Sequence, residues 1–449
     1  MSSITGNLGV ENVVPARASS IRWRVMACIT LVTTLTYLDR LNLSIAAKFI
    51  QDEFRFTTQQ MGWVLSAFLL GYALLQIPGG WIGDRFGARN VLAGAIVFWS
   101  AFTACTGLAP RLMVFGLSGV WSFMIARFLV GAGEAATSPN GNKIVANWMG
   151  SAHRGTGASF TILGVGIGGA ITPPFIAMLM QRYGWRASFY ISAILGLAVV
   201  AVWLAVVTNR PEENRRVNAA ELSLIAAGRA SQGSTHQSAV TVPWSRILRS
   251  ASAWGLFLGY FCQGFPIYFY HTWFFLYLIK VRHLGITEGG WWGATPYLAI
   301  VALAPLGGIF SDWISTRLGK RAGRRIAVAS GMFASSALLW FGSHAAKDSA
   351  AIAMLAIGGG MNMFAASTFW AACIDLTTGF TGALSGMMNT FGNLGGWLSP
   401  IVTAYLAQNY GWNRALDCAA VVSVLSGLFF QFVQADRTFD SSASAERVG

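Results

Sequence analysis

Residues 80–89 read GWIGDRFGAR, and a degenerate copy of this pattern returns at residues 308–312, which read GIFSD. In both copies a glycine stands four positions before an aspartate, and the copies are 228 residues apart. A longer match lies at an offset of 227, where residues 173–185 read PPFIAMLMQRYGW and residues 400–412 read PIVTAYLAQNYGW. The shared proline, Tyr-Gly-Trp and aspartate indicate two repeated halves in the same orientation.

The chain between these motifs is too apolar for a water-soluble protein. Hydrophobic residues make up 54% of the 449 residues, charged residues only 11%, and the mean hydropathy is +0.53. A soluble domain has about 25% charged residues, and a membrane-spanning helix needs about 20 mainly apolar residues. Twelve such stretches lie near 23–48, 60–82, 91–109, 118–138, 156–180, 187–208, 253–279, 291–313, 325–344, 350–372, 382–407 and 413–434. We therefore predict an all-α integral membrane protein with twelve transmembrane helices in two parallel-repeat six-helix bundles.

The longest polar stretch divides these spans six and six. It predicts an N-terminal half at 1–208, a cytoplasmic central loop at 209–252 and a C-terminal half at 253–449. If both termini are cytoplasmic, the loops and ends on that side hold 20 Lys and Arg, and the outside loops hold nine. Because cytoplasmic loops are enriched in basic residues, we expect both termini inside and a multi-pass protein of the plasma membrane, the bacterial inner membrane. This placement also explains the net charge of +14 without a nucleic-acid partner.

Four ionisable residues lie inside the predicted spans. Asp39 and Arg40 fall in the span near 23–48, and Arg127 and Glu134 in the span near 118–138. Each costs about 2.5–3.5 kcal/mol at a helix centre, so the favoured interpretation is a functional role in a water-filled cavity; the alternative is a static ion-pair lock. Seven residues are two helical turns, which places Arg127 and Glu134 on one face, about 10.5 Å apart. The neighbours Asp39 and Arg40 point about 100° apart, so one can face the fourth span and the other the cavity.

These four residues have no charged counterparts in the second half. A shift of 227 leads to Pro266, Ile267, Met354 and Met361. We therefore assign the ionic machinery to the first half, with Asp39 and Glu134 as proton-coupling candidates. Arg40 is the first choice for gripping a substrate carboxylate with two parallel hydrogen bonds. Arg127 is the second choice, or it neutralises Glu134 during the cycle.

These motifs resemble the major facilitator superfamily, whose loop motif matches residues 80–89. Residues 37–42, which read YLDRLN, resemble the anion:cation symporter family of sugar-acid permeases, sialin and vesicular glutamate transporters. Residues 127–134 (RFLVGAGE), 272–273 (TW) and 389–396 (NTFGNLGG) extend the match. Residues 160–164 (FTILG) depart from it, because several bacterial members carry a glutamine there, and His271 replaces an apolar residue. The resemblance implies a monomeric secondary transporter working by alternating access.

Further candidates follow from polar and aromatic residues within the spans and from the loop motif. For substrate contacts these are Tyr37, Tyr72, Tyr268, His271, Trp273, Asn389 and Asn393, with Asn42 as a further candidate; helix packing is the alternative role for each. For gating at the cytoplasmic side they are Gly80, Asp84, Arg85, Gly87 and Arg89, with Asp312 in the second copy. Lys143 and Asp375 are expected to be anchors or gate residues near cytoplasmic ends.

The predicted function is import of a small organic anion by proton symport, the anion being a sugar acid such as an aldonate, hexuronate or glucarate. Alternatives left open are an aromatic or dicarboxylic acid as substrate, sodium as the coupling ion, and a transporter-like ligand sensor. The five cysteines show no metal-ligand spacing, and the sequence contains neither a P-loop nor an HExxH motif. No nucleophile–base set points to an enzyme. We expect no cofactor and no metal.

Overall fold

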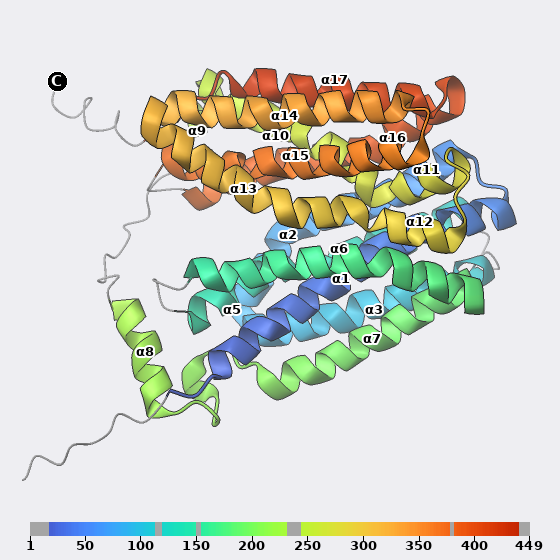
Figure 1. Ribbon diagram of the computed structural model, residues 1–449. Coiled ribbons are helices and arrows are strands. Elements are labelled where there is room, and N and C mark those ends of the chain that lie inside the picture. The colour runs from blue at the N-terminus through green and yellow to red at the C-terminus, as the bar shows by residue number, and fades with distance from the viewer. Residues whose placement is uncertain (1–17, 113–118, 150–153, 231–243, 378–380, 440–449) are drawn as a thin grey trace, which may run out of the picture.

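The computed structural model describes residues 18–112, 119–149, 154–230, 244–377 and 381–439, which are almost entirely α-helical (Figure 1). The first half contains α1 (Ile21–Phe54), α2 (Thr58–Phe86), α3 (Ala88–Leu112), α4 (Gly119–Glu134), α5 (Thr137–Trp148), α6 (Arg154–Tyr183) and α7 (Trp185–Val206). The second half contains α10 (Ala251–Thr272), α11 (Phe274–Lys280), α12 (Ile286–Gly293), α13 (Thr295–Leu318), α14 (Lys320–His344), α15 (Asp348–Leu376), α16 (Thr381–Tyr410) and α17 (Trp412–Phe430). Between them lie a 3₁₀ turn (Pro211–Glu213), α8 (Ala219–Ala230) and α9 (Trp244–Arg249).

Each predicted span coincides with helix in the structure. Within the described residues, eight helical segments have the length and apolar character to cross a membrane. The predicted spans that contain α1, α4, α10 and α16 are helical as well but fall outside this group of eight. The prediction of an all-helical membrane protein is confirmed, and the number of helices that cross the membrane stays a prediction.

Three predicted spans are interrupted rather than continuous. The span near 118–138 is divided between α4 and α5, because Pro139 has no backbone N–H to donate to the carbonyl of Ala135. The span near 291–313 is divided between α12 and α13 at Ala294, and Pro296 then occupies the first turn of α13, where a missing N–H costs nothing. The span near 253–279 is divided at Trp273.

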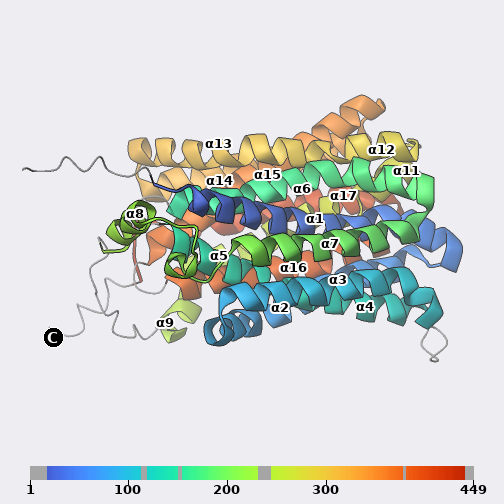
Figure 2. The same cartoon turned by 90° about the horizontal axis from the view of Figure 1, so that it is seen from below.

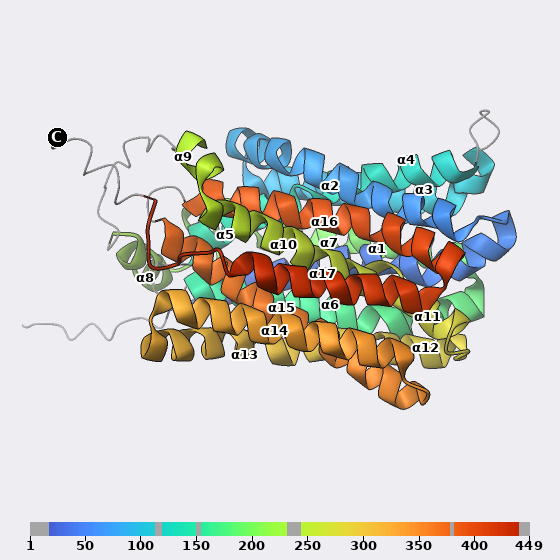
Figure 3. The same cartoon turned by 90° about the horizontal axis from the view of Figure 1, so that it is seen from above.

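The helices of the two halves run roughly parallel and form two bundles that lie side by side (Figures 1 and 2). The seam between the bundles is made by α2 against α16 and by α6 against α12 and α13. The beginning of α1, the helices α8 and α9 and the described residues that follow α17 lie together at one end of the molecule (Figures 1 and 3). We call this the α8 end, and we call the opposite end, where α11 and α12 lie, the α12 end.

Hydrogen bonds join the two halves at the α12 end. The Gln59 amide N donates to Gln408 Oε1 (3.0 Å), and Lys280 Nζ donates to Gln51 Oε1 (2.8 Å). On the other side of the seam, Thr287 Oγ1 on α12 donates to Gln181 Oε1 on α6 (2.6 Å). One bundle is thus fastened to the other at the end where α1 stops and α2 starts.

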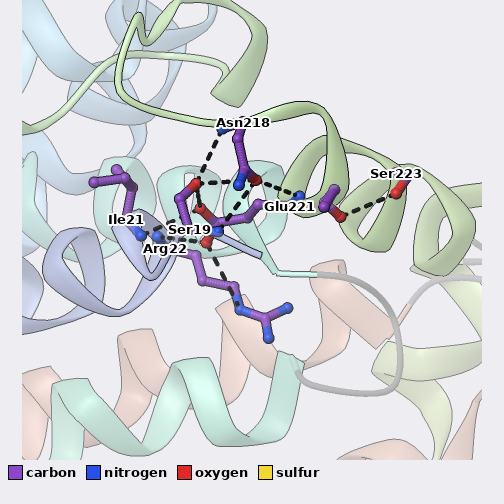
Figure 4. Close-up of polar contacts among 7 residues, drawn as sticks. Ser19, Ile21, Arg22, Asn218, Glu221 and Ser223 are labelled. Atoms are coloured by element: carbon purple, nitrogen blue, oxygen red, sulfur yellow. Dashed lines mark hydrogen bonds and ion pairs between the residues drawn. The ribbon is translucent and has the colours of Figure 1, made fainter. Parts of the chain in front are cut away.

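The central segment predicted as a loop contains a helix that is attached to the first half. Glu221 on α8 is fully buried and accepts hydrogen bonds from Ser19 Oγ (2.5 Å), Ile21 N (3.2 Å) and Arg22 N (3.1 Å) (Figure 4). Ile21 and Arg22 carry free amides of the first turn of α1, so a carboxylate from another helix caps α1. Asn218 Oδ1 accepts from both Ser19 N and Glu221 N, which fixes the start of α8 to the same point. We call this cluster of Ser19, Ile21, Arg22, Asn218 and Glu221 the α1 cap.

The far end of the central segment belongs to the second half. Ile247 on α9 is fully buried in the same apolar cluster as Phe257 of α10 and Phe430 of α17. Arg246 Nη1 donates to the carbonyl of Phe439 (3.4 Å). The central segment is therefore shared between the two bundles.

Candidate substrate and coupling site

The ionisable residues of α1 and α4 meet inside the first bundle. Arg40 Nε donates to Glu134 Oε2 (2.8 Å), across a sequence separation of 94 residues. The Glu134 side chain is fully buried, and Arg40 is 16% exposed. Glu134 is the last residue of α4, where the helix carries partial negative charge, so the carboxylate depends on Arg40 for compensation. Its second oxygen, Oε1, has no hydrogen-bond partner among the described residues.

Three aromatic rings surround the Arg40 guanidinium. Its Cζ lies 4.7 Å from the ring centre of Tyr72, 5.1 Å from that of Phe68 and 5.5 Å from that of Tyr37. Each ring face attracts a cation, and together they hold the guanidinium in one place without neutralising it. The rings therefore position the guanidinium, while its charge is compensated by Glu134, its ion-pair partner among the described residues.

Asp39 and Arg127 lie deeper and are sealed from the cavities. Asp39 is 1% exposed and Arg127 is 2% exposed. Arg127 Nη1 donates to the backbone carbonyl of Asp39 (3.3 Å) and its guanidinium lies 5.0 Å from the ring centre of Phe68. Neither carboxylate oxygen of Asp39 has a described partner with good hydrogen-bond geometry, and the nearest donors are the Trp99 and Thr103 side chains on α3. A buried carboxyl with so few close donors is costly when ionised, so this position suits a group that binds and releases a proton.

Glycines on α4 explain how this cluster is sealed. A side chain at Gly131 would collide with the carbonyl oxygen of Phe68 on α2, and one at Gly133 would lie 2.9 Å from the Cβ of Trp99 on α3. These glycines let three helices approach closely enough to exclude water from Glu134 and Arg127. Arg40, the first choice for the substrate carboxylate, lines a cavity, whereas Arg127, the second choice, is buried and lines neither substrate cavity.

The first cavity lies within the first bundle and has a volume of about 240 Å³. Arg40, Tyr37 and Tyr72 line it, and Tyr72 OH is 3.1 Å from Ser138 Oγ on α5. Its remaining polar lining consists of hydroxyls and an amide: Thr33, Thr36, Thr137, Ser138, Asn142 and Thr161. Among the described residues that line this cavity, Arg40 alone carries a formal charge.

The second cavity, of about 140 Å³, lies at the seam between the bundles. It adjoins the first, because Tyr37 and Val165 line both. Predicted residues on its wall are Tyr37, Tyr268, His271, Asn389 and Asn393. Asn393 is 7% exposed, and its Nδ2 has no acceptor among the described residues. Asn389 Nδ2 reaches Gln76 Oε1 on α2 at 3.4 Å.

His271 is held by aromatic neighbours from both halves. Its Nδ1 is 2.9 Å from Tyr297 OH, and the two rings stack at 5.7 Å with an interplanar angle of 13°. The rings of Tyr37 and Tyr268 meet the imidazole edge-on at 5.8 and 5.2 Å. His271 therefore closes the second cavity together with Tyr297.

Two predicted contact residues have packing partners instead and line neither cavity. Trp273 is fully buried, donates from Nε1 to the carbonyl of Pro400 (3.2 Å) and packs on the ring of Trp412. Asn42 is fully buried and exchanges hydrogen bonds with Ser188 and Ser192 on α7. Their substrate role, like that of every residue named from the sequence, remains a proposal.

Sequence reasoning missed three residues of the second cavity. Gln263 Nε2 donates to Asn362 Oδ1 (2.6 Å), while Tyr260 and Tyr297 contribute phenol rings. The signal that identified Asn389, a polar residue inside an apolar span, applies equally to Gln263. Tyr260 could not be singled out, because α10 contains many aromatic residues. The neighbouring sequence does not distinguish a tyrosine that lines a cavity from one that packs between helices.

The predicted gating motif forms contacts within the first half. Asp84 pairs with Lys143 on α5, and Gly80 packs on Pro139. Gly87 has a φ of +86°, which favours glycine, and it ends α2. Arg89 Nε and Nη2 donate to the carbonyls of Val207 (2.5 Å) and Leu204 (2.7 Å) at the end of α7.

The other members of the motif and its second copy also lie at the α8 end. Arg85 is exposed and stacks over the rings of Trp81 and Phe86. In the second half, Arg324 bridges Asp312 (2.6 Å) and Asp375 (2.9 Å). Each bundle thus has an ion-pair network of its own at this end.

Comparison with known proteins identifies the class. The family described as Major Facilitator Superfamily matches residues 29–400. The chain is 32% identical over 429 residues to the probable galactarate/D-glucarate transporter GudP of Escherichia coli (strain K12), covering 92% of this chain and 94% of that protein. It is 29% identical to the hexuronate transporter of Bacillus subtilis (strain 168), with coverages of 90% and 92%.

Among solved structures, a bacterial homologue of the human lysosomal transporter Spinster, inward-facing and unoccupied, superposes with a TM-score of 0.76 at 17% identity, covering 93% of this chain and 98% of that chain. The fold and these matches define a multi-pass membrane transporter and not an enzyme. The chain belongs to the major facilitator superfamily. Within it, this protein is related to galactarate/glucarate, hexuronate and anion transporters, which confirms the resemblance read from the sequence. Among the described residues, no group of three or more His, Cys, Asp and Glu is placed to hold a metal.

Proposed function

We propose that this transporter imports a small organic anion, a sugar acid such as an aldonate, hexuronate or glucarate, by proton symport. The observation that carries the proposal is the pairing of cavity-lining Arg40 with Glu134, a carboxylate sealed from water. Arg40 cannot fully compensate Glu134 and at the same time grip a substrate carboxylate with both arms of its fork. A proton and an anion therefore act on the same arginine.

The coupling follows from charge. A proton on Glu134 removes its charge, weakens its hold on Arg40 and frees the guanidinium for the anion. Counted over Asp39, Arg40, Arg127 and Glu134, the net charge is +2 when both acids are protonated and zero when both are ionised. In a water-poor site the first state attracts an anion strongly and the second releases it.

The second cavity supports a hydroxylated substrate. A sugar acid has a carboxylate at one end and hydroxyls along the rest, and the amides and phenols on the wall of the second cavity complement hydroxyls. The unpartnered Asn393 Nδ2 offers a donor at this wall. Residues 160–164 lack the glutamine that several bacterial members carry, but Gln263 places another side-chain amide on the wall of the second cavity, where its Nε2 already donates to Asn362.

We infer an alternating-access cycle with both termini in the cytoplasm. The first cavity extends toward the α8 end, where Ile29 on α1 and Gly141 on α5 line it. At the α12 end, by contrast, hydrogen bonds hold the two bundles together. With the α8 end in the cytoplasm, this is an inward-facing form, and rocking of the bundles exposes the site to the other side. Labelling of a cysteine at position 234, in a variant free of other cysteines, tests the orientation; reaction with an impermeant reagent from outside intact cells contradicts it.

A second candidate is an acid with two carboxylates or with an aromatic ring. Glucarate, which the first proposal includes, also has two carboxylates, so the former candidate is distinct only when the dicarboxylic acid lacks the sugar hydroxyls. The rings of Tyr37, Tyr268 and Tyr297 beside the second cavity favour the latter. Competition by defined acids separates these candidates from a monocarboxylic sugar acid.

The decisive experiment is uptake of radiolabelled sugar acid into proteoliposomes under an imposed pH gradient. Uptake should rise as the external pH falls, collapse with a protonophore and be competed by carboxylic acids but not by their neutral amides. A sodium gradient at fixed pH serves as the control for the coupling ion. Binding without any uptake would favour a ligand sensor, and equal competition by the neutral amide would overturn the anion assignment.

A further inference from the structure

An apolar groove of about 710 Å³ lies on the flank of the seam, away from the substrate cavities. Its walls are α2 and α4 of the first half and α16 of the second, which lie beside one another in Figure 3. We call it the seam groove. Trp63 and Leu70 on α2, Trp121 and Ile125 on α4, and Trp397 and Ile401 on α16 form its main surfaces. Between 40 and 57% of the Trp63, Leu70, Trp121 and Ile125 side chains is exposed, so this groove opens outward from the bundles.

The groove offers its occupant almost nothing polar. Apart from the indole N–H groups of its three tryptophans, the polar side chains among its described lining residues are Gln60 and Ser66. Ser66 Oγ already donates to the carbonyl of Trp397 (2.8 Å), and Gln60 Oε1 already accepts from Thr57 N (2.9 Å). A ligand that depends on hydrogen bonds is therefore poorly matched, and a hydrocarbon is well matched.

The length of the groove matches one leaflet of a bilayer. It runs from Gln60 to Leu70 on α2, about 15 Å at 1.5 Å per residue. Half of a hydrocarbon core about 30 Å thick is also about 15 Å. The groove begins at Gln60, two residues after the start of α2. Trp63 and Trp121 lie near this end of the groove, as expected of rings at a membrane interface.

The groove also crosses the seam that holds the α12 end together. Below it, Gly62 packs on the carbonyl of Pro400, and Ser66 bonds to Trp397. A chain lying in the groove touches both bundles at once. If α16 moved away from α2, the wall formed by Trp397 and Ile401 would leave, so the occupant discriminates between the two states.

We propose that the seam groove binds one acyl chain of a phospholipid in the leaflet at the α12 end, and that the bound chain favours the state in which this end is closed. The binding site rests on the groove alone. The conformational effect rests on the alternating access proposed above.

The test of binding uses full-length protein in bilayers that contain phosphatidylethanolamine with a photoactivatable group in the middle of one acyl chain. After irradiation, mass spectrometry of peptides should find adducts concentrated on α2, α4 and α16 at the groove. Leu70→Trp and Ile125→Trp fill the groove from its exposed rim and should reduce these adducts to the level found on α7. Leu197→Trp and Ile194→Trp are matched controls, because both residues are more than half exposed on α7 and should leave the adducts unchanged.

The conformational effect has a separate readout. Spin labels at Arg55 and Asn409, both exposed at the α12 end, report the distance between the bundles. Leu70→Trp should increase the population with a long distance, and Leu197→Trp should not. Adducts spread evenly over the surface, or a cross-link to a second copy of the chain at the groove, would overturn the binding site. Normal adducts with unchanged distances would overturn the conformational effect alone, and neither result depends on the substrate.

Discussion

Gly62 on α2 and Gly290 on α12 are equivalent residues of the two halves, and each packs against a proline carbonyl of the opposite half. A Cβ on Gly62 would lie 2.8 Å from Pro400 O and 2.7 Å from Ala404 Cβ. A Cβ on Gly290 would lie 3.0 Å from Pro173 O and 2.8 Å from Ala177 Cβ. The prolines occupy matching positions of the repeat found in the sequence. The two sides of the seam are therefore the same contact made twice.

The first prediction concerns this contact. Gly62→Ala or Gly290→Ala forces the bundles apart at the α12 end, because the facing atoms are a proline carbonyl oxygen and an alanine Cβ, and neither can turn away. Overpacking costs typically about 1–3 kcal/mol, and each 1.4 kcal/mol is roughly tenfold in a population. Spin-label distances across the α12 end should lengthen in each variant. Gly94→Ala is the control, since no atom lies within 4 Å of its Cβ position; the same lengthening there would refute the explanation.

The second prediction concerns the anion. Arg40→Lys keeps the charge but loses the planar fork, so substrate affinity should fall strongly while folding is retained. Arg40→Ala should abolish transport, since it also leaves Glu134 uncompensated. Binding measured calorimetrically, together with uptake, checks both variants. Full transport by Arg40→Ala would show that the carboxylate binds elsewhere.

The third prediction concerns coupling. Glu134→Gln and Asp39→Asn mimic the protonated acids, so each should abolish accumulation driven by a pH gradient. At least one should retain substrate binding or exchange between labelled and unlabelled substrate. Counterflow in proteoliposomes without a gradient separates these activities. If both variants still concentrate substrate against a gradient, the coupling residues have been misassigned.

The fourth prediction concerns the unpaired amide in the second cavity. Asn393→Ala removes a donor that has no acceptor among the described residues, so the fold should lose little stability while the substrate loses a hydrogen bond. A hydrogen bond contributes about 0.5–1.5 kcal/mol, which predicts a loss of affinity of roughly two- to tenfold. Asn42→Ala is the contrasting variant, because it removes bonds to Ser188 and Ser192 and should lower thermal stability. Unchanged affinity in Asn393→Ala would exclude this residue from the site.

The fifth prediction concerns the α1 cap. Glu221→Ala leaves the amides of Ile21 and Arg22 without their acceptor and removes the shorter of the two hydrogen bonds that the Ser19 hydroxyl donates (Figure 4). A lost capping group costs about 0.5–2 kcal/mol, so the melting temperature in detergent should fall. Glu288→Ala, at an exposed acid in the first turn of α12, is the control and should change it little. Equal melting temperatures for wild type and Glu221→Ala would mean that α8 contributes nothing to the first bundle.

Much of the fold was predictable because it depends on apolar length and on repetition. The positions of the helices and the equivalence of Pro173 and Pro400 follow from those patterns alone. The breaks at Ala136 and Ala294 were not predicted, although Pro139 and Pro296 stood next to them. In a membrane, proline within an apolar stretch is common, so its presence alone does not indicate whether the helix bends or ends.

The residue types of the candidate site were predictable from the sequence, but which side chains face a cavity was not. The cost of charge in a bilayer selects Asp39, Arg40, Arg127 and Glu134, and the 100° step separates Asp39 from Arg40. Which of the two arginines reaches a cavity depends on how closely α4 approaches α2 and α3, and that closeness is set by tertiary contacts at Gly131 and Gly133. Trp273 illustrates the same limit. The Thr-Trp pattern at residues 272–273 resembles the family, but it does not reveal that the Trp273 indole N–H donates to the Pro400 carbonyl.

The pairing of Arg40 with Glu134 has a consequence for synthesis of the protein. Helices enter the membrane in the order in which they leave the ribosome, and Arg40 precedes its partner by 94 residues. Until α4 arrives, α1 carries two charged side chains, each costing about 2.5–3.5 kcal/mol at the centre of a lone helix. The first helix is thus poorly able to remain in lipid by itself. Its stable insertion should wait for α4, so the N-terminal segments enter the bilayer as a group.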